Sequence, residues 1–301
     1  MELSIGRKKA SKGSKMLSII KKKRWTKSNT SFTKKQKAQV DKLLKEGEPL
    51  IKLDKDKNNL LHLAIICNEL SYVKTALKIE DLIEEENALG FTPKDLAIML
   101  GRKSMIPLFK KEKPHIFKIV KEGDHLHLNQ KEFEKFFQLS FYPNLRFANV
   151  SILNWIVKRC NRAVKKKEMT REQKWLGKYY ATEIESGYTA DMRIEFINAM
   201  MGFGLFAEKK IKKKAFIAEY IGEVRKYNLD KDYKNAYCFE YLIADVYDTP
   251  FIIDAKDSGN IARFVNHDPK GNVTPTAVYH KGIMRVVLQA NRDIKKDEQL
   301  C

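Results

Sequence analysis

The sequence predicts an α+β protein of several domains, in which a mainly helical first part precedes a β-rich last third. Two observations predict this. Hydrophobic residues recur at three- and four-residue steps before about residue 190, and short β-branched and aromatic runs follow it. The strand-like runs within residues 191–301 are not separated by helices of about ten residues. A doubly wound nucleotide-binding fold is therefore disfavoured.

The length and composition are those of a folded protein with two modest domains or one large one. Its 301 residues, 43% of them hydrophobic, are enough for a sizeable core. No apolar run approaches the roughly 18 residues of a membrane span, and the short run MLSII lacks the length of a signal peptide. We expect the protein to be cytoplasmic when made. Because the cysteines are widely spaced, we predict reduced thiols and no metal site: Cys67, Cys160, Cys238 and Cys301.

Residues 1–35 form a predicted flexible basic arm in a chain of net charge +20. The first forty residues contain thirteen Lys or Arg but one acid, Glu2. Blocks of like charge repel each other and stay solvated, which is one interpretation of the arm. The other is that it binds an acidic partner or nucleic acid. The run KKKR at residues 21–24 also suits nuclear import.

Residues 36–112 contain a repeat. NLLHLA at 59–64 and TPKDLA at 92–97 end in alanines that are 33 residues apart. Both segments resemble the ankyrin repeat, which has this period and pairs of stacked helices. The resemblance implies that Leu63 and Leu96 fill the core, and that Ala64 and Ala97 let helices approach closely. The array either docks a partner protein or braces the neighbouring domain, and a chance pairing of helical hairpins is the alternative.

Residues 113–190 are predicted to form a helical connector packed on the last domain. EFEKFFQL and VSILNWIVKRC place apolar residues at three- and four-residue steps, so each helix can bury one face. The segment KKKEMTREQKW is polar and is expected to be exposed. Two tryptophans of this region, Trp155 and Trp175, are expected to belong to the core rather than to a binding surface.

Three segments of the β-rich part occur together and in a fixed order. They are GFGLFA at 202–207, EYIGE at 219–223 and DAKDSGNIARFVNHD at 254–268. Their order and spacing resemble the SET domain of protein lysine methyltransferases over residues 191–301. The resemblance implies a small β-fold with a threaded, pseudoknot-like active-site segment. It also implies that S-adenosylmethionine binds on one face, while a substrate lysine enters a narrow channel from the other.

The resemblance also assigns residues to the cofactor. Two glycines would let the backbone approach it without a Cβ clash. His267 alone would be read as an ordinary loop histidine, but its neighbours favour a cofactor-binding turn. Arg263 and Phe264 would fix the threaded segment. The predicted cofactor-binding residues are Met201, Gly202, Phe203, Gly204, Arg263, Asn266 and His267.

Methyl transfer needs a neutral amine, and a free lysine with a pKa near ~10.4 is rarely neutral at pH 7. A desolvated aromatic channel favours the neutral form and aligns the reacting atoms. Tyr220 in EYIGE and Tyr237 in YCF match catalytic family positions, and Phe239 would limit the width of the channel. Half-buried strand aromatics are the alternative interpretation of these residues.

The match departs from the family pattern in three ways, one of which is the absence of a cysteine-rich segment before the domain. Asp268, Pro269 and Gly271 stand where the family's Asn-His motif continues toward a zinc-binding cysteine, so we expect closure of the site by the connector or by a partner. IKKDEQLC at 294–301 resembles I-x-x-G-E-E-L, which in the family runs on to an aromatic-Asp-Tyr tripeptide with the principal catalytic tyrosine. We therefore expect the natural chain to continue beyond Cys301.

The sequence predicts a protein lysine N-methyltransferase that uses S-adenosylmethionine. Histone tails are the family's common substrates, although they are basic like this chain. Ankyrin repeats joined to this domain also occur in effectors that bacteria deliver into host cells. The resemblance therefore leaves two sites of action open besides the cytoplasm, namely a host cell and a nucleus. The alternative function is a catalytically inactive scaffold for protein–protein interaction.

Overall fold

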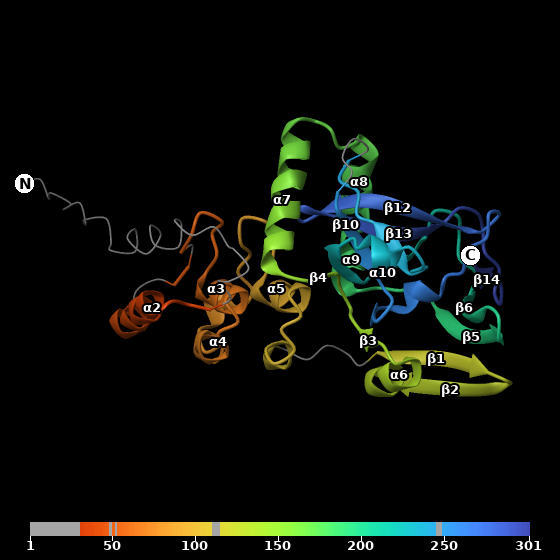
Figure 1. Cartoon of the computed structure of the whole chain (residues 1–301), viewed down its shortest axis with the longest axis horizontal. Helices are drawn as coiled ribbons and strands as arrows, with labels where there is room; N and C mark the ends of the chain where they lie inside the picture. Colours follow the sequence, from red (N-terminus) through yellow and green to blue (C-terminus); the bar gives the residue numbers. More distant parts are fainter. Residues whose placement is uncertain (1–30, 48–49, 52, 110–114, 245–248) are drawn as a thin grey trace, which may run out of the picture. The chain divides into compact units, whose positions relative to one another are not determined.

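The structure is a computed structural model that describes residues 31–47, 50–51, 53–109, 115–244 and 249–301. The chain divides into two compact units, residues 1–110 and 111–301 (Figure 1). The described residues of each unit include a buried hydrophobic core. The predicted basic arm lies outside the described residues except for its last few, so its behaviour stays a prediction. None of the helices in the described ranges is long and apolar enough to cross a bilayer.

The first unit consists of short helices. They are α2 (Lys34–Glu46), α3 (Leu60–Ile66), α4 (Leu70–Ala76) and α5 (Pro93–Met99), with 3-10 turns η1 (Glu80–Leu82) and η2 (Ile106–Leu108). Helices α2, α3 and α5 each begin with a capping box, in which the N-cap side chain and the third helical residue satisfy each other's backbone amides. The first residues of α3 and α5, Leu60 and Pro93, are 33 positions apart, in step with the repeat.

A buried histidine connects the two repeat motifs. His62 is fully buried, its Nε2 lies 2.8 Å from the carbonyl oxygen of Phe91, and its Nδ1 lies 2.8 Å from Oδ1 of Asn59. Burial lowers the pKa of His62 below its ordinary value of 6.5, so the ring is neutral at pH 7. The four core residues expected from the repeat are all buried: Leu63, Ala64, Leu96 and Ala97. The assignment to the ankyrin family itself stays a prediction.

The second unit combines helices with small sheets. Its helices are α6 (Gln130–Phe137), α7 (Val150–Lys165), α8 (Arg171–Tyr179), α9 (Ala181–Ser186) and α10 (Leu229–Asp232), with the 3-10 turn η3 (Ile261–Phe264). Its strands are β1 (Ile116–Lys121), β2 (Asp124–Asn129), β3 (Ser140–Phe141), β4 (Arg146–Phe147), β5 (Met192–Asn198), β6 (Gly202–Ala207), β7 (Phe216–Glu219), β8 (Glu223–Lys226), β9 (Cys238–Glu240), β10 (Phe251–Asp254), β11 (Ser258–Gly259), β12 (Val273–His280), β13 (Ile283–Ala290) and β14 (Gln299–Leu300).

These strands form four sheets within the described residues, in the orders β14-β6-β5-β1-β2, β4-β8-β10-β9, β11-β3 and β12-β13-β7. Each strand-like run predicted in residues 191–301 contains a strand. The prediction missed β12, because Pro275 interrupts its sequence and a proline cannot donate to a ladder. Helix α8 packs on β12, and Gly177 is needed there because a Cβ would overlap the backbone of Tyr279.

The prediction of a wholly helical connector over residues 113–190 is wrong for residues 116–129. These residues form the β1–β2 hairpin, whose turn residues Glu122 and Gly123 both have positive φ. The alternation of buried and more exposed residues in IFKIV is a strand signal, and the helical interpretation of this region does not account for it. The same region is not a separate body, since β1, β3 and β4 pair in parallel with β5, β11 and β8.

The two tryptophans expected in the core are not fully buried. Trp155 is 37% exposed and packs edge-on against Phe251, while Trp175 is 58% exposed. Helix α7 instead buries a stripe of smaller apolar residues: Ile152, Leu153, Ile156, Val157, Cys160 and Ala163. In α8 the close approach at Gly177 and the burial of Leu176 fix which face points inward, and Trp175 lies on the other side.

Candidate active site

The turn between β5 and β6 carries the first group of predicted cofactor-binding residues. Oδ1 of Asn198 accepts hydrogen bonds from the backbone amides of Met200 and Met201, at 3.0 and 2.9 Å, and this closes the turn. Gly202 follows with a φ of +69°, a conformation that residues with a Cβ rarely adopt. Met201 is 47% exposed, so this turn presents its backbone at the surface.

Gly204 lies where three distant segments of the chain converge. A Cβ on Gly204 would lie 2.8 Å from Cδ1 of Ile197, 2.9 Å from Nε2 of Gln299 and 3.1 Å from Nδ2 of Asn266. These residues come from β5, from β14 and from the loop after η3. Glycine leaves room for both amide side chains beside the strand without displacing them. The fold thus brings the GFG and NH motifs together with β14.

The two amides at this place are poorly satisfied by the protein. Nε2 of Gln299 is buried and has no hydrogen-bond partner within the described part of the chain, while Nδ2 of Asn266 reaches the carbonyl oxygen of Phe203 only at 3.5 Å. Turning the Gln299 amide over would still leave a buried polar atom there. Buried polar groups normally have partners, so this pair has hydrogen-bonding capacity for a ligand. Sequence reasoning missed Gln299, although it belongs to the quoted IKKDEQLC match.

The segment that follows the NH motif binds strand β14 and Cys301 through hydrogen bonds. The Asn272 side chain donates to the Gln299 carbonyl oxygen at 2.7 Å and accepts from the Cys301 amide at 3.0 Å. Strand β14 is held on its other side by β6 through the pair Leu300 and Leu205. These contacts support the predicted threading, which itself stays a prediction.

The predicted catalytic tyrosines lie together. Tyr220 is buried, and its hydroxyl donates to the carbonyl oxygen of Tyr237 at 2.9 Å. The Tyr220 ring meets Phe239 edge-on at 4.4 Å between centroids. Burial raises the pKa of Tyr220 above its ordinary value of 10.0, so its hydroxyl stays a neutral donor at physiological pH. Tyr237 is 38% exposed, which places the group at the edge of the protein surface.

Arg263 connects the tyrosines to the η3 turn. Its Nε donates to the carbonyl oxygen of Ala255 at 2.8 Å, and a terminal nitrogen donates to that of Lys256 at 3.1 Å. Its guanidinium carbon lies 4.1 Å from the centre of the Tyr237 ring. Burial lowers the pKa of Arg263 below 12.5, but the group remains charged at pH 7. The structure thus shows Arg263 positioning Tyr237, while its predicted contact with a cofactor is untested.

The structure separates the two residues of the NH motif. Asn266 is partly buried beside Gly204, whereas His267 is exposed and has no hydrogen-bond partner among the described residues. The predicted role of Asn266 therefore agrees with its position next to the β5–β6 turn. His267 is free to contact a ligand from the solvent side of this loop, but nothing in the fold holds its ring in place.

Helix α6 covers the same motifs with aromatic rings. Phe137 lies 5.0 Å from the ring of Phe203 and 4.7 Å from that of Phe264, and Phe136 lies 6.0 Å from Phe203. Sequence reasoning expected closure from the connector without naming these residues. The available signal was the amphipathic run EFEKFF, which buries Phe133 against the hairpin and leaves Phe136 partly exposed.

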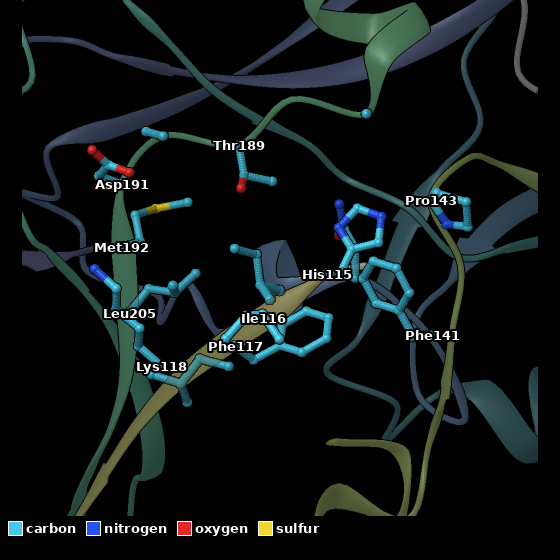
Figure 2. A pocket seen from close by; sticks show the side chains of 15 residues that line it. His115, Ile116, Phe117, Lys118, Phe141, Pro143, Thr189, Asp191, Met192 and Leu205 are labelled. Atoms are coloured by element: carbon cyan, nitrogen blue, oxygen red, sulfur yellow. The ribbon is translucent and has the colours of Figure 1, made fainter. Parts of the chain in front are cut away.

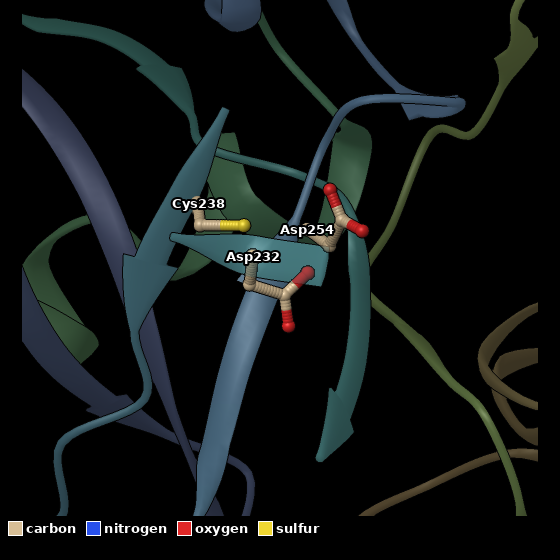
Figure 3. Close-up of side chains that lie close together, drawn as sticks. All are labelled: Asp232, Cys238 and Asp254. Atoms are coloured by element: carbon tan, nitrogen blue, oxygen red, sulfur yellow. The ribbon is translucent and has the colours of Figure 1, made fainter. Parts of the chain in front are cut away.

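A cluster of Asp232, Cys238 and Asp254 lies near the tyrosines (Figure 3), with ligand atoms within 4.8 Å of one another. Arg225 pairs with both carboxylates, since its guanidinium donates to Asp232 and Asp254 at distances of 2.6–2.9 Å. The Arg225 hydrogen bonds lower the pKa of Asp232 to about 2, and burial raises the pKa of Cys238 to about 12. The cluster is an ion-pair network that fastens α10 to β10.

A cavity of about 160 Å³ opens between β1, β5 and the 187–192 segment (Figure 2). Lys118, Phe117 and Met192 are among its lining residues, and Asn260 and Ile261 close one side. None of the predicted site residues lines it. The candidate site is therefore the Gly204 and Tyr220 region rather than this cavity.

Comparison with known proteins identifies the class to which the last third belongs. Residues 202–301 match the family model described as SET domain. The chain thus carries a SET domain in this range, and all three sequence motifs lie within it.

Curated relatives match the same part of the chain. The H3 lysine-4-specific histone-lysine N-methyltransferase of Schizosaccharomyces pombe is 37% identical over 101 residues, which cover 32% of this chain and 11% of the relative. The histone-lysine N-methyltransferase EZH2 of Chaetomium thermophilum is 31% identical over 111 residues, which cover 33% and 7%. The chain therefore spans about a tenth of the length of these relatives.

Two solved structures were also compared. The polycomb repressive complex 2 of Chaetomium thermophilum matches with a TM-score of 0.33 and 26% identity, over 39% of this chain and 15% of the other. An autoinhibited form of that complex bound to S-adenosylmethionine gives a TM-score of 0.34 and 27% identity, over 39% and 15%. Both TM-scores are low, and neither similarity supports a conclusion about this chain.

Proposed function

We propose that this protein is an S-adenosylmethionine-dependent protein lysine N-methyltransferase whose reaction takes place in residues 191–301. The convergence of Gly204, Asn266 and Gln299 is the observation that carries the proposal. It joins the GFG and NH motifs, leaves the buried Gln299 Nε2 without a partner among the described residues, and leaves Asn266 with only a 3.5 Å hydrogen bond. The SET-domain match and the names of the curated relatives agree with it.

The residues present fit the proposed cofactor. Backbone groups of Met201, Gly202 and Phe203 lie at the end of the β5–β6 turn and the start of β6, and the amides of Asn266 and Gln299 supply hydrogen-bonding groups beside Gly204. When bound, S-adenosylmethionine supplies the electrophilic methyl group. Phe136 and Phe137 of α6 would keep water from one side of this place and hold the Phe203 ring.

The aromatic group supplies what the substrate amine needs. A lysine that enters between Tyr220, Tyr237 and Phe239 is desolvated, which disfavours its charged form. Tyr220 stays protonated, so its hydroxyl oxygen can accept a hydrogen bond from the amine while it donates to Tyr237. Arg263 keeps the Tyr237 ring in place and its positive charge further disfavours an ammonium ion.

The substrate is proposed to be a lysine on a protein. Two curated relatives are named histone-lysine methyltransferases, so a histone is the first substrate to test, and action in a nucleus would follow from it. The first unit is proposed to be an ankyrin-type module that docks a partner protein. The repeat of capped helices and the His62 link between motifs support that assignment.

The test is transfer of labelled methyl groups from S-adenosylmethionine to histone H3 and to mixed cell proteins by the natural full-length protein. Tyr237→Phe and His267→Ala should reduce transfer. Tyr233→Phe, which removes the hydroxyl of an exposed tyrosine outside the site, should leave transfer unchanged. Cofactor binding by calorimetry without any transfer would favour the alternative, a scaffold that has kept the fold. A folded protein that does not bind the cofactor would contradict the proposal.

A further inference from the structure

The end of α7, the loop after it and α8 form a strongly basic segment. Residues 158–178 contain nine Lys or Arg and only two acids. Arg171, Lys174 and Lys178 are spaced so that they share one side of the helix, opposite the buried Leu176. Among the described residues, these three side chains have no ion-pair partner. Their charge is therefore available to a ligand.

Two aromatic rings lie on the same face. Trp175 and Tyr179 stack on each other with ring centroids 4.9 Å apart and planes 15° from parallel, and they are 58% and 63% exposed. A pair at positions i and i+4 stabilises a helix by a few tenths of a kcal/mol, which is the plain explanation. That explanation does not account for the three cations around the rings or for the cavity next to Tyr179.

A cavity of about 410 Å³ continues from this face toward β7. Tyr179, Tyr188 and Lys214 are among its lining residues, and Glu183 is the one acid among them. Tyr188 is itself 49% exposed. Lys214 contributes a cation to the far side of this lining, and Lys212 and Lys213 directly precede it; all three lysines are exposed and have no ion-pair partner among the described residues. We call this surface, from Arg171 across the rings to Lys214, the aromatic groove.

We propose that the aromatic groove binds single-stranded nucleic acid. Exposed flat rings offer stacking faces to bases of any sequence, and cations on both rims match a phosphate backbone on either side. A duplex keeps its bases stacked inside and gains nothing from the rings. An acidic peptide or an anionic membrane would use the lysines but would not need the stacked pair. The inference stands on the surface of α8 and does not depend on methyl transfer.

The test uses the full chain, so the basic arm contributes equally to every variant. Binding of a fluorescent twelve-nucleotide oligo(dT) or oligo(U) is measured by anisotropy at several salt concentrations. Trp175→Ala with Tyr179→Ala should raise the Kd roughly 5- to 150-fold with an unchanged salt slope. Lys174→Gln with Lys178→Gln should lower the slope of log K against log salt by about 0.7 per lysine.

The matched control is Lys295→Gln with Lys296→Gln, which removes the same charge from an exposed turn elsewhere and should leave the slope unchanged. Quenching of tryptophan fluorescence by oligo(dT) is a second readout. This quenching should be lost in Trp175→Phe, which is not a disruptive substitution. The proposal is overturned if the aromatic double variant, folded by circular dichroism, keeps the wild-type Kd. It is also overturned if the two lysine pairs behave alike, or if anionic phosphatidylserine vesicles or poly-Glu bind the groove more tightly than the oligonucleotide.

Discussion

Gly204→Ala is the substitution whose effect the structure defines best. The new Cβ would lie 2.8 Å from Ile197 Cδ1 and 2.9 Å from Gln299 Nε2, where carbon contacts normally begin at about 3.5 Å. All three close atoms are at the ends of side chains, so they can move apart while the backbone stays. We expect an overpacking cost of about 1–3 kcal/mol in the free energy of unfolding.

The expected loss of cofactor binding is of the same size as the cost to folding. Moving the amides of Asn266 and Gln299 removes two hydrogen bonds to the ligand, each with a net value of about 0.5–1.5 kcal/mol. The Kd for S-adenosylmethionine should therefore rise roughly 5- to 150-fold. Calorimetric titration measures this, and a thermal melt measures the stability of the same sample.

Gly123→Ala is the control for the glycine substitution itself. Gly123 has a φ of +91° at the tip of the β1–β2 turn, and no atom lies within 4 Å of its added Cβ. It should cost about 1–2 kcal/mol of backbone strain with no change in cofactor affinity. A folded Gly204→Ala protein that binds S-adenosylmethionine with the wild-type Kd would refute the inference that these amides contact the cofactor.

Three further predictions concern the framework of the site. Arg285→Met leaves Glu219 buried without its partner at 3.0 Å and should lower the free energy of unfolding in urea by about 3–5 kcal/mol. Adding Glu219→Gln should recover most of this loss. A loss below about 1 kcal/mol for Arg285→Met would contradict the prediction. Hydrogen bonds with Arg225 lower the pKa of Asp232 from 3.8 to about 2. Above pH 4, Asp232 therefore contributes about 2 kcal/mol to the free energy of unfolding, and this contribution is lost as the pH falls to 2. Asp232→Asn should flatten this acid limb, and an unchanged profile would disprove the role. Phe137→Ala should lower the melting temperature and raise the cofactor Kd, because two ring contacts worth about 0.5–1.5 kcal/mol each are lost; wild-type values for both would contradict it.

Particular residues show how far the sequence predicts the site. Linear motifs predict Gly202, Gly204 and Asn266 as members of the candidate site, because glycine next to a rare dipeptide is informative without coordinates. Gln299 was not found, since its importance comes from the distance to Gly204 across two strands. The α6 rings were not found either, because an amphipathic helix shows that one face is buried but not what buries it.

The sequence by itself determined the order of the parts, the SET-domain motifs and the 33-residue repeat, since these depend on residue identity and local spacing. The tertiary structure alone decided that residues 116–129 are strands within the same unit, that Trp175 is exposed, and that Asn266 and Gln299 meet at Gly204. Pairing between strands and the choice of buried face depend on contacts between residues distant in the chain. Such contacts leave no fixed spacing in the sequence.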